Sequence, residues 1–335
     1  MKKTAISFLS SVLCVLVFMA GCSFAMSKYD NVTLRLSCNG TDFGNDTRAA
    51  RLFAELVEKK SDGLVKIQVF NGDQLASGNM QQAIGLLLDG TVELDVHSTS
   101  IISTLDNNLM VSTLPWIFAN YEVAEEKFYG KGGEYIQKLL APKGIRYLGA
   151  VHNGFKAMTC SKRQIKSPED LKGLKMRIPG GEFFSAFYST FGASPQAMSW
   201  AEVFTALQQG TIDGHDNSLS TISSNNIQEV QKYISISNHT YEAFTFMANE
   251  VKFSSLSKDT QDLIIQSVEE ATKITNRKII EEESALIEKF KTVTHNEIYA
   301  FTPNDIAEFK TIIAPLMEKY KGIYGDEACQ AFEIQ

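Results

Sequence analysis

The feature that most constrains the fold is an order of strand patterns and helical patterns that begins twice along the chain. In the first part, alternation of apolar and polar residues predicts strands at 32–36, 65–69 and 92–96. Helices are expected between them, one starting near Thr47 and the next with Ser77 as its cap. Strands that alternate with helices are typical of a mostly parallel sheet covered by helices on both faces.

The second part repeats this order. Capping residues mark two helix starts, Ser167 with Asp170 and Ser199 with Glu202. A further helix is expected over 182–191. Strands are expected at 146–151, 156–160, 175–178, 211–216, 232–237 and 244–249. The chain is therefore predicted to form two α/β units rather than one.

A long helical pattern follows the second unit. Ser257 caps it, and it continues to about Lys291. At a rise of 1.5 Å per residue this helix would extend roughly 50 Å, which exceeds one small domain, so we expect it to lie across both units. A strand near 298–301 and a helix from about Asn304 complete the chain. We predict a two-lobed fold with a hinge and a ligand cleft between the lobes, where pockets of α/β proteins tend to form.

The first residues have the pattern of an export signal. Lys2 and Lys3 precede an apolar run over 5–19, which is shorter than the roughly 20 residues that a membrane-spanning helix needs. Residues 1–21 are therefore predicted to be a signal peptide, and the mature protein is expected to be periplasmic or otherwise extracytoplasmic. Residues 19–22 resemble a lipoprotein box, in which Cys22 would carry the lipid.

The cleavage site and the cysteines leave alternatives open. Ser23-Phe24-Ala25 also fits cleavage before Met26, in which case Cys22 is removed. Three cysteines then remain in the folded part, far apart and without a CxxC motif, so they indicate neither zinc nor a redox pair: Cys38, Cys160 and Cys329. Cys160 and Cys329 are compatible with a disulfide and equally with buried free thiols.

The charge of the chain narrows the classes of partner. Removing residues 1–21 takes away two lysines and no acid, which changes the formal net charge from −7 to −9. This balance argues against nucleic acid or an anionic membrane surface as a partner. An anionic ligand would therefore need a local cluster of positive charge.

Motifs of enzymes and metal sites are missing from the sequence. There is no HExxH, GxSxG, P-loop or GxGxxG motif, and the five histidines are dispersed without metal-ligand spacing. We therefore expect no catalytic residue, no metal and no cofactor. An exported enzyme that uses two acidic residues brought together by the fold remains the alternative from another class.

A set of motifs in a fixed order carries a more specific signal. They are Gln-Leu at 74–75, Leu-Pro-Trp-Ile-Phe at 114–118, Asn-Gly-Phe-Lys at 153–156, Ser-Pro-Glu-Asp-Leu-Lys-Gly-Leu-Lys-Met-Arg-Ile-Pro at 167–179, Gly-Ala-Ser-Pro at 192–195, Trp-Ala-Glu-Val-Phe-Thr-Ala-Leu-Gln-Gln-Gly at 200–210, Ile-Asp-Gly-His-Asp-Asn at 212–217 and Glu-Val-Gln-Lys-Tyr at 229–233. Over essentially the whole mature chain they resemble the DctP-type solute-binding proteins of TRAP (tripartite, ATP-independent) transporters.

This resemblance implies a periplasmic-binding-protein-like fold whose lobes close over an organic acid, such as a dicarboxylate or a sugar acid. Lobe I is expected over 27–153 plus about 243–282, and lobe II over 154–242 plus about 283–335. The loaded protein, expected to be a monomer, would deliver its ligand to the small and large membrane subunits of an ion-gradient-driven permease. The same ligand chemistry also suits a component of a sensory system.

The resemblance also assigns site residues in the second part of the chain. Arg177 matches the arginine that binds the ligand carboxylate, and a planar guanidinium suits that group because it donates two parallel hydrogen bonds. Asn217 matches an asparagine that donates to the same carboxylate, and Trp200 matches an aromatic residue against the ligand. Lys156 stands where the family usually has arginine. The alternatives are a surface ion pair for Arg177, a turn position for Asn217, a core position for Trp200 and a smaller role for Lys156.

Candidates in the rest of the cleft rest on weaker signals. Asn39, His97 and Ser98 come at the ends of predicted strands. Glu182 is expected either to bond ligand hydroxyls or to favour a helix N-terminus. Phe183 belongs to a phenylalanine-rich segment that we interpret mainly as packing, with Phe183 itself as a candidate for lining the cleft. Sialate is disfavoured as a ligand, because Ser98 and Ile101 stand near the places of an acid and an arginine in sialate-binding relatives.

Overall fold

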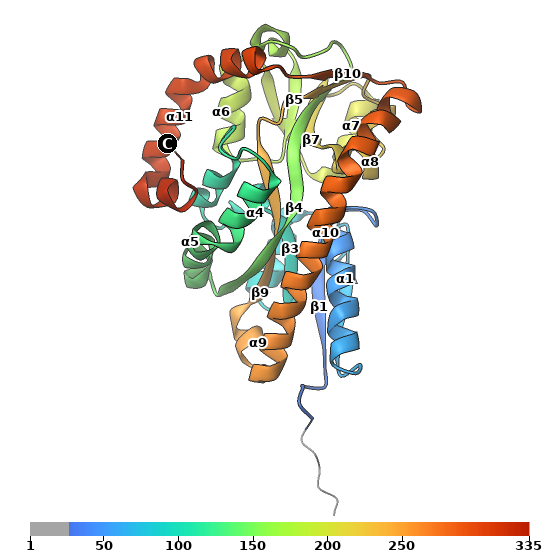
Figure 1. The fold of residues 1–335 in the computed structure, drawn as a ribbon, viewed down its shortest axis with the longest axis vertical. Coiled ribbons are helices and arrows are strands. Elements are labelled where there is room, and N and C mark those ends of the chain that lie inside the picture. The colour runs from blue at the N-terminus through green and yellow to red at the C-terminus, as the bar shows by residue number, and fades with distance from the viewer. Residues whose placement is uncertain (1–26, 335) are drawn as a thin grey trace, which may run out of the picture.

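A central sheet with helices on both faces forms the molecule in the computed structural model, which describes residues 27–334 (Figure 1). The predicted signal peptide at 1–21 and Cys22 therefore lie outside the described residues. The sheet has the strand order β2-β1-β3-β9-β4-β7-β5-β6, and β8 and β10 join it through β4. The strands are β1 Val32–Cys38, β2 Val65–Phe70, β3 Leu94–Ser98, β4 Ile145–Cys160, β5 Lys175–Ile178, β6 Ser194–Ala197, β7 Gly214–Ser218, β8 Tyr233–Ile236, β9 Tyr241–Asn249 and β10 Glu297–Ala300.

The two flanks of the sheet are parallel and its middle is antiparallel. Strands β1, β2 and β3 pair in parallel on one flank, and β5 pairs in parallel with β6 and β7 on the other. Between the flanks, β9 and β4 run antiparallel to each other and to their outer neighbours. The predicted α/β class is confirmed, while the expectation of a mostly parallel sheet holds only for the flanks.

Strand β4 joins the two halves of the molecule, one containing β1, β2 and β3 and the other containing β5, β6 and β7. The sequence prediction was wrong for this strand. Two strands were expected at 146–151 and 156–160, but the chain forms one strand of 16 residues. Its register with β9 shifts between Tyr147 and Gly149 and again between His152 and Gly154. Gly154 has φ 122°, and a Cβ there would lie 2.9 Å from the Tyr121 hydroxyl. The glycine therefore marks a bulge in a continuous strand rather than a turn.

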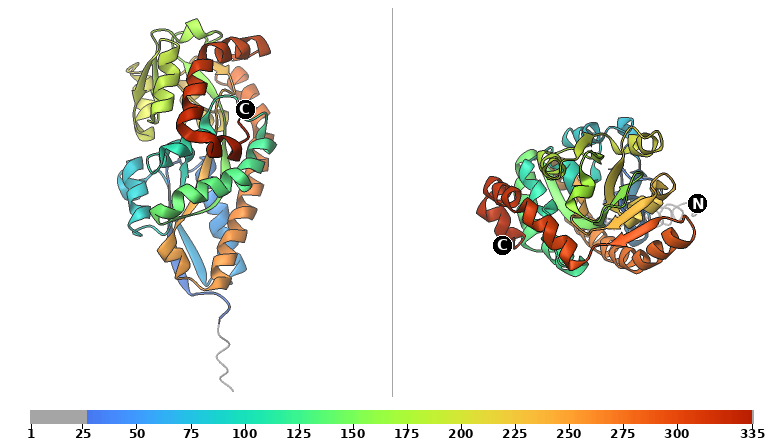
Figure 2. Two further views of the ribbon diagram at one scale, coloured as in Figure 1. Left: turned by 90° about the vertical axis from the view of Figure 1, so that its left-hand side faces the viewer. Right: turned by 90° about the horizontal axis from the view of Figure 1, so that it is seen from above.

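The predicted long helix is present and packs on both halves. Helix α10 runs over Lys258–Thr292, and the Ser257 side chain accepts a hydrogen bond from the Thr260 N–H. In Figure 1 it crosses the molecule diagonally, from beside α1 (Asn45–Lys60) to α8 (Leu219–Ser224), and it contacts both helices. Helix α11 (Pro303–Ala331) also touches both halves, because it packs on α6 (Glu182–Thr190) and on α5 (Lys131–Leu140), as Figure 2 shows.

The remaining helices are short. They are α2 Met80–Leu88, α3 Thr99–Ile102, α4 Tyr121–Tyr129, α7 Trp200–Gln208 and α9 Glu250–Ser254, with the 3-10 helices η1 Gln74–Ala76, η2 Asn107–Thr113, η3 Ala141–Lys143, η4 Pro168–Leu171 and η5 Ile227–Glu229. No helix within residues 27–334 combines the length and apolar character needed to cross a membrane.

Two predicted caps are corrected. Asn79, not Ser77, caps α2, because Ser77 adopts a left-handed conformation at the end of η1 two residues earlier. Ser199 precedes α7 as expected, but its side chain makes no capping hydrogen bond. The acidic cap at Ser167 does form, since the Asp170 carboxylate accepts a hydrogen bond from the Ser167 N–H at 2.9 Å. It starts the 3-10 helix η4 rather than an α-helix.

Candidate ligand-binding cleft

A polar pocket lies where the ends of the parallel strands from both halves meet. The space between its lining residues amounts to about 510 Å³, part of it open to solvent. Asn39 follows β1, Ser98 ends β3, Pro179 follows β5 and Asn217 lies near the end of β7. The other lining residues are Gly40, Gly44, Asn45, Asp46, Met80, Ser100, Ile101, Asn153, Lys156, Arg177, Trp200, Thr221, Ser224, Asn225, Glu242 and Phe244.

Arg177 brings a buried positive charge to this pocket. Its side chain is 4% exposed, and Nε and Nη2 donate to the Met198 carbonyl oxygen at 3.2 and 2.8 Å. It makes no salt bridge with any residue of 27–334, and its guanidinium carbon lies 5.4 Å from the Trp200 ring. Burial lowers the pKa of Arg177 to about 10, so the group still carries its charge at neutral pH. An anion in the pocket would supply the missing partner.

Asn217 presents a second donor beside Arg177. Its Oδ1 accepts hydrogen bonds from the Ser218 N–H at 3.0 Å and from Asn153 Nδ2 at 3.3 Å. Because the backbone N–H can only donate, these contacts fix the orientation of the amide. Within the described chain Nδ2 has no hydrogen-bond partner, and Asn217 lines the pocket. The two residues that the sequence analysis placed on the ligand carboxylate are thus brought together.

Lys156 also lines the pocket, but its ammonium group already has two carboxylate partners. Nζ lies 3.0 Å from Glu242 Oε2 and 3.4 Å from Asp216 Oδ1, and all three side chains are buried. Burial alone would lower the pKa of Lys156, but Asp216 and Glu242 outweigh burial and raise it. Its charge is therefore balanced inside the protein.

Asp216, the partner of Lys156 on β7, lies behind the pocket wall. It also accepts hydrogen bonds from the Tyr188 hydroxyl at 2.6 Å and from His239 Nε2 at 3.1 Å. Burial would raise the pKa of Asp216, but Lys156 and His239 lower it well below its usual range. The Asp216 carboxylate is therefore held ionised behind the pocket wall, where it adds to Glu242 as a second negative charge beside the Lys156 ammonium.

Three further predicted residues reach the pocket. Trp200 lines it, and its Nε1 donates to Asn225 Oδ1 at 3.1 Å. Ser98 lines it with its Oγ 3.0 Å from Ser100 Oγ. Asn39 lines it from the loop after β1. The indole thus offers an apolar surface, and the amide and hydroxyl groups offer donors and acceptors on the opposite wall.

Three predicted residues do not reach it, which corrects the sequence analysis. His97 is fully buried, and its ring nitrogens lie 2.7 Å from Asp95 and 2.8 Å from Asp73. Successive side chains of a strand point to opposite faces, so Ser98 faces the cleft and His97 faces away from it. Phe183 is 1% exposed and packs against Tyr320.

Glu182 is the third of these residues. It lines a separate surface hollow together with Gln81 and Pro179 and is exposed. It lies in the first turn of α6, where an acidic side chain is favoured by the positive end of the helix. The alternative given for it in the sequence analysis therefore fits its position.

Several pocket residues were missed because each looks ordinary in the sequence. Glu242 is a single acid within an apolar strand pattern and belongs to no motif. Asn153 belongs to the Asn-Gly-Phe-Lys motif, but the motif assigned it no role in the site. Asn45 and Asp46 look like ordinary helix-start residues, and they are the first two residues of α1. Buried charge in a strand was the one available signal for Glu242, because a buried acid is rarely left unpaired.

Asp46 is a buried acid in the pocket wall. Its Oδ2 accepts a hydrogen bond from the Gly40 N–H at 2.6 Å, and Oδ1 has no partner among the described residues. Burial raises the pKa of Asp46 to about 6. Gly40 is required for this packing, because a Cβ at that position would lie 2.0 Å from Oδ1.

Replacing Asp46 with asparagine is expected to raise the stability of the ligand-free protein at pH 7 by about 1–3 kcal/mol. The folded-state pKa of about 6 lies above the usual 3.8, so the ionised carboxylate destabilises the fold above about pH 6 and not below about pH 4. Urea unfolding of both proteins at pH 7 and pH 4 measures this. A stability difference that does not shrink at pH 4 would contradict the assignment.

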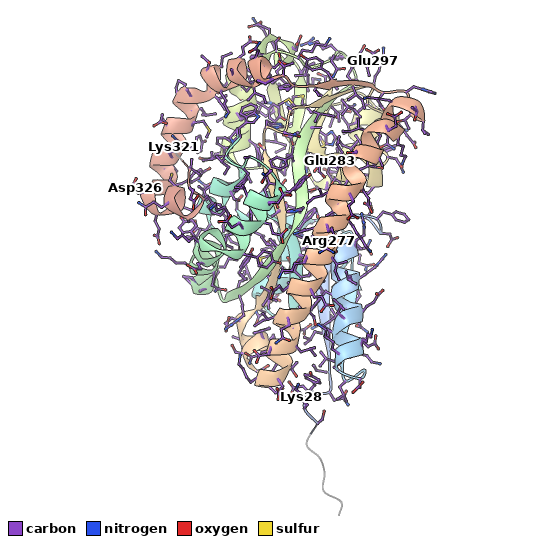
Figure 3. The ribbon with its side chains drawn as sticks, in the orientation of Figure 1. Lys28, Arg277, Glu283, Glu297, Lys321 and Asp326 are labelled. Atoms are coloured by element: carbon purple, nitrogen blue, oxygen red, sulfur yellow. The ribbon has the colours of Figure 1, made fainter. Side chains whose placement is uncertain are left out.

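No metal arrangement is associated with the pocket. Over residues 27–334, no group of three or more His, Cys, Asp or Glu side chains is placed to hold a metal ion. The three cysteines in this part of the chain are free, so the alternative of a disulfide between Cys160 and Cys329 is not realised. The charged side chains Lys156, Arg177 and Glu242 of the cleft are buried. Those on the outer surface, such as Arg277 and Glu297, project into solvent (Figure 3).

The α/β fold and its polar cleft, which is lined by a buried guanidinium without a carboxylate partner in the described chain, indicate a solute-binding protein. Residues 44–322 match the family described as Bacterial extracellular solute-binding protein, family 7 (DctP), and the chain belongs to this family. It is 29% identical to the 2,3-diketo-L-gulonate-binding periplasmic protein YiaO of Escherichia coli, over 82% of this chain and 84% of that protein. It is also 29% identical to the C4-dicarboxylate-binding periplasmic protein DctP of Rhodobacter capsulatus, over 85% of each.

Solved structures agree with this assignment. The sugar acid binding protein DctPAm of Advenella mimigardefordensis, in complex with galactonate, is 29% identical and superimposes with a TM-score of 0.86 over 91% of this chain and 97% of that one. A TRAP periplasmic solute-binding protein of Shewanella oneidensis with bound succinate is 26% identical, with a TM-score of 0.84 over 90% and 98%. The predicted family and fold are confirmed.

Proposed function

We propose that this chain captures a small organic acid outside the cytoplasmic membrane and delivers it to the small and large subunits of a TRAP permease. Its family consists of solute-binding components of transport systems, and the two similar structures described above hold galactonate and succinate. Removal of residues 1–21 and a lipid on Cys22 would keep the protein near that permease. It would act as a monomer, without cofactor or catalysis.

The observation that carries this proposal is the buried guanidinium of Arg177. It has no carboxylate partner in the described part of the chain, and the free amide nitrogen of Asn217 lines the same pocket. A buried charge without a partner is unfavourable. A ligand carboxylate would accept from both residues and neutralise the guanidinium. Trp200 would cover an apolar face of the ligand.

Contacts across the cleft support closure around the ligand. Asn45 Nδ2 donates to Ser220 Oγ at 2.8 Å, and Thr41 Oγ1 donates to the Ser224 carbonyl oxygen at 3.3 Å. Both contacts join the β1–α1 segment to α8. We propose that the lobes are 27–153 plus about 243–282 and 154–242 plus about 283–335, and that the bulge at Gly154 acts as the hinge. Contacts made only in the closed form let the ligand stabilise that form.

A thermal-shift screen of the mature protein against organic acids and their neutral analogues tests the proposal. A ligand at 100 times its Kd stabilises the folded state by about 2.7 kcal/mol, which raises Tm by about 5 °C. We expect such a rise for a few acids and none for their amides or alcohols. A rise only with neutral or cationic compounds would overturn the assignment of Arg177.

Two other functions remain as alternatives with their own tests. NMR of the ligand after prolonged incubation distinguishes a binding protein, which returns the acid unchanged, from an exported enzyme. Uptake of the labelled acid in a strain lacking this protein distinguishes transport from sensing, because a sensory component leaves uptake intact. We expect an unchanged ligand and a loss of uptake.

A further inference from the structure

We infer that the cleft selects a monocarboxylate carrying several hydroxyl groups, the chemistry of an aldonate, over a dicarboxylate, and that Glu242 determines this selectivity. The inference rests on the proposed function and narrows its ligand class. It is carried by the separation of hydrogen-bond donors and acceptors in the pocket, and by the number of its charges that lack a partner.

The donors without partners gather at the ends of β5 and β7. Arg177 Nη1 makes no hydrogen bond among the described residues, and neither does Asn217 Nδ2. Both are donors only, and an ionised carboxylate is an acceptor only. One carboxylate of the ligand is therefore matched by this end of the pocket.

The other wall is rich in acceptors. Asn45 uses Nδ2 to donate to the His152 and Asn153 carbonyl oxygens at 3.2 and 3.3 Å and to Ser220 Oγ. These carbonyl contacts fix its amide, so Oδ1 is the group without a partner in the described chain. Asp46 Oδ1 is a second unpartnered acceptor in the lining.

Glu242 is the charged acceptor of this wall. Its Oε1 accepts a hydrogen bond from the Ser100 N–H at 3.1 Å, and Oε2 lies 3.0 Å from Lys156 Nζ. Each carboxylate oxygen has two lone-pair sites, so each keeps one for a further donor. Burial would raise the pKa of Glu242, but Lys156 and Ser100 lower it. The group is ionised at neutral pH and can only accept.

The salt bridges of the lining leave one cation for the ligand. Lys156 is already balanced by Glu242 and by Asp216 beneath it. Of the lysines and arginines that line the pocket, Arg177 alone has no salt bridge within the described chain. A second carboxylate on the ligand would find no unpaired cation, and it would face the carboxylate of Glu242.

A hydroxyl group meets the opposite situation. It donates to Glu242 or Asn45 and accepts from the hydroxyls of Ser98 and Ser100, which line the same wall. The C–H groups along the carbon chain of such a ligand would pack on Trp200 and Phe244, which also line the pocket. Sites built to bind a hydroxyl reject analogues that lack it by as much as about 10⁴-fold, because their own polar groups are left unpaired. Repulsion between like charges adds to the discrimination against diacids.

Calorimetric titration with matched ligands tests this. The set contains C4–C6 aldonates of different configuration, the unsubstituted diacid and monoacid of each chain length, and the corresponding alditols. We expect the tightest aldonate to bind at least about 100-fold more tightly than the diacid or the plain monoacid of the same length. A diacid that binds as tightly as the tightest aldonate overturns the inference while the proposed function stands. Binding of alditols alone overturns both.

The Glu242→Gln variant assigns the selectivity to its residue. Glutamine keeps an acceptor and removes the charge, while Lys156 keeps Asp216 as its partner. We expect the aldonate-to-diacid affinity ratio to fall at least about tenfold, since a charge-assisted hydrogen bond is lost and the repulsion is removed. Glu182→Gln, outside the pocket, should leave the ratio unchanged. An unchanged ratio in a folded Glu242→Gln protein overturns the role of Glu242. If that variant fails to fold, Glu242→Ala, which also removes the charge, serves instead, and an unchanged ratio in it has the same meaning.

Discussion

Replacing Arg177 with alanine is expected to weaken ligand binding strongly while leaving the ligand-free protein about as stable as before. In the ligand-free protein the guanidinium is buried with only the Met198 carbonyl oxygen to accept from it, so its removal relieves a desolvation penalty. In the complex the same change leaves a ligand carboxylate buried without its partner, which costs about 2–5 kcal/mol, or roughly 30- to several-thousand-fold in Kd. Calorimetric titration and urea unfolding measure the two effects separately.

Matched variants separate charge, shape and packing. Arg163 also donates to backbone carbonyl oxygens, those of Asp170 and Lys172, but it does not line the cleft. Arg163→Ala should therefore leave affinity unchanged. Arg177→Lys keeps the charge without the planar fork and should bind with intermediate affinity. If Arg177→Ala binds the acid as tightly as the wild-type protein does, Arg177 is not the carboxylate-binding residue.

Replacing Lys156 with methionine is expected to destabilise the folded protein by about 3–5 kcal/mol. The change leaves Glu242 and Asp216, which are 3% exposed, without the ammonium that balances them. The pKa values of both acids are lowered in the folded protein, so the stability from this pairing is present above about pH 4 and is lost as pH falls further. The difference between variant and wild type should therefore shrink in acid.

Urea unfolding at pH 7 and pH 3.5 measures this difference, and an exposed lysine provides the control. Lys258 pairs with Asp262 at 2.6 Å but is 78% exposed, so Lys258→Met should change stability by less than about 0.5 kcal/mol. Adding Glu242→Gln to Lys156→Met should restore part of the loss, because one unpaired buried charge is removed. A loss below about 1 kcal/mol for Lys156→Met would show that the buried charges are balanced in another way.

Local patterns in the sequence predicted the elements better than their connections. The long helix α10 and its Ser257 cap follow from periodicity and capping, and both are present. The continuity of β4 did not follow, because Asn153-Gly154 looks like a turn when the partner strand β9 is unknown. Helix α11 packs on α5 and α6, which lie far from it in the sequence, so no local pattern records its path.

The site divides in the same way. Arg177 and Asn217 were found because they belong to motifs, and the structure brings them together. Glu242 lies far from Lys156 in the sequence, so their ion pair is visible only in the folded chain. His97 was an avoidable error: side chains alternate along a strand, so His97 and Ser98 cannot both face one cleft. Strand alternation should have assigned the cleft to only one of the two.

The most direct test of the account is a thermodynamic cycle between Arg177 and the ligand carboxylate. The tightest-binding aldonate and the alditol of the same chain length are titrated into the wild-type protein and into Arg177→Ala. We predict that the wild-type protein binds the aldonate more tightly than the alditol by about 2–5 kcal/mol. The variant should lose nearly all of this difference. A variant that keeps the full preference would contradict the claim that Arg177 binds the carboxylate, and the cleft would then recognise its ligand by other groups.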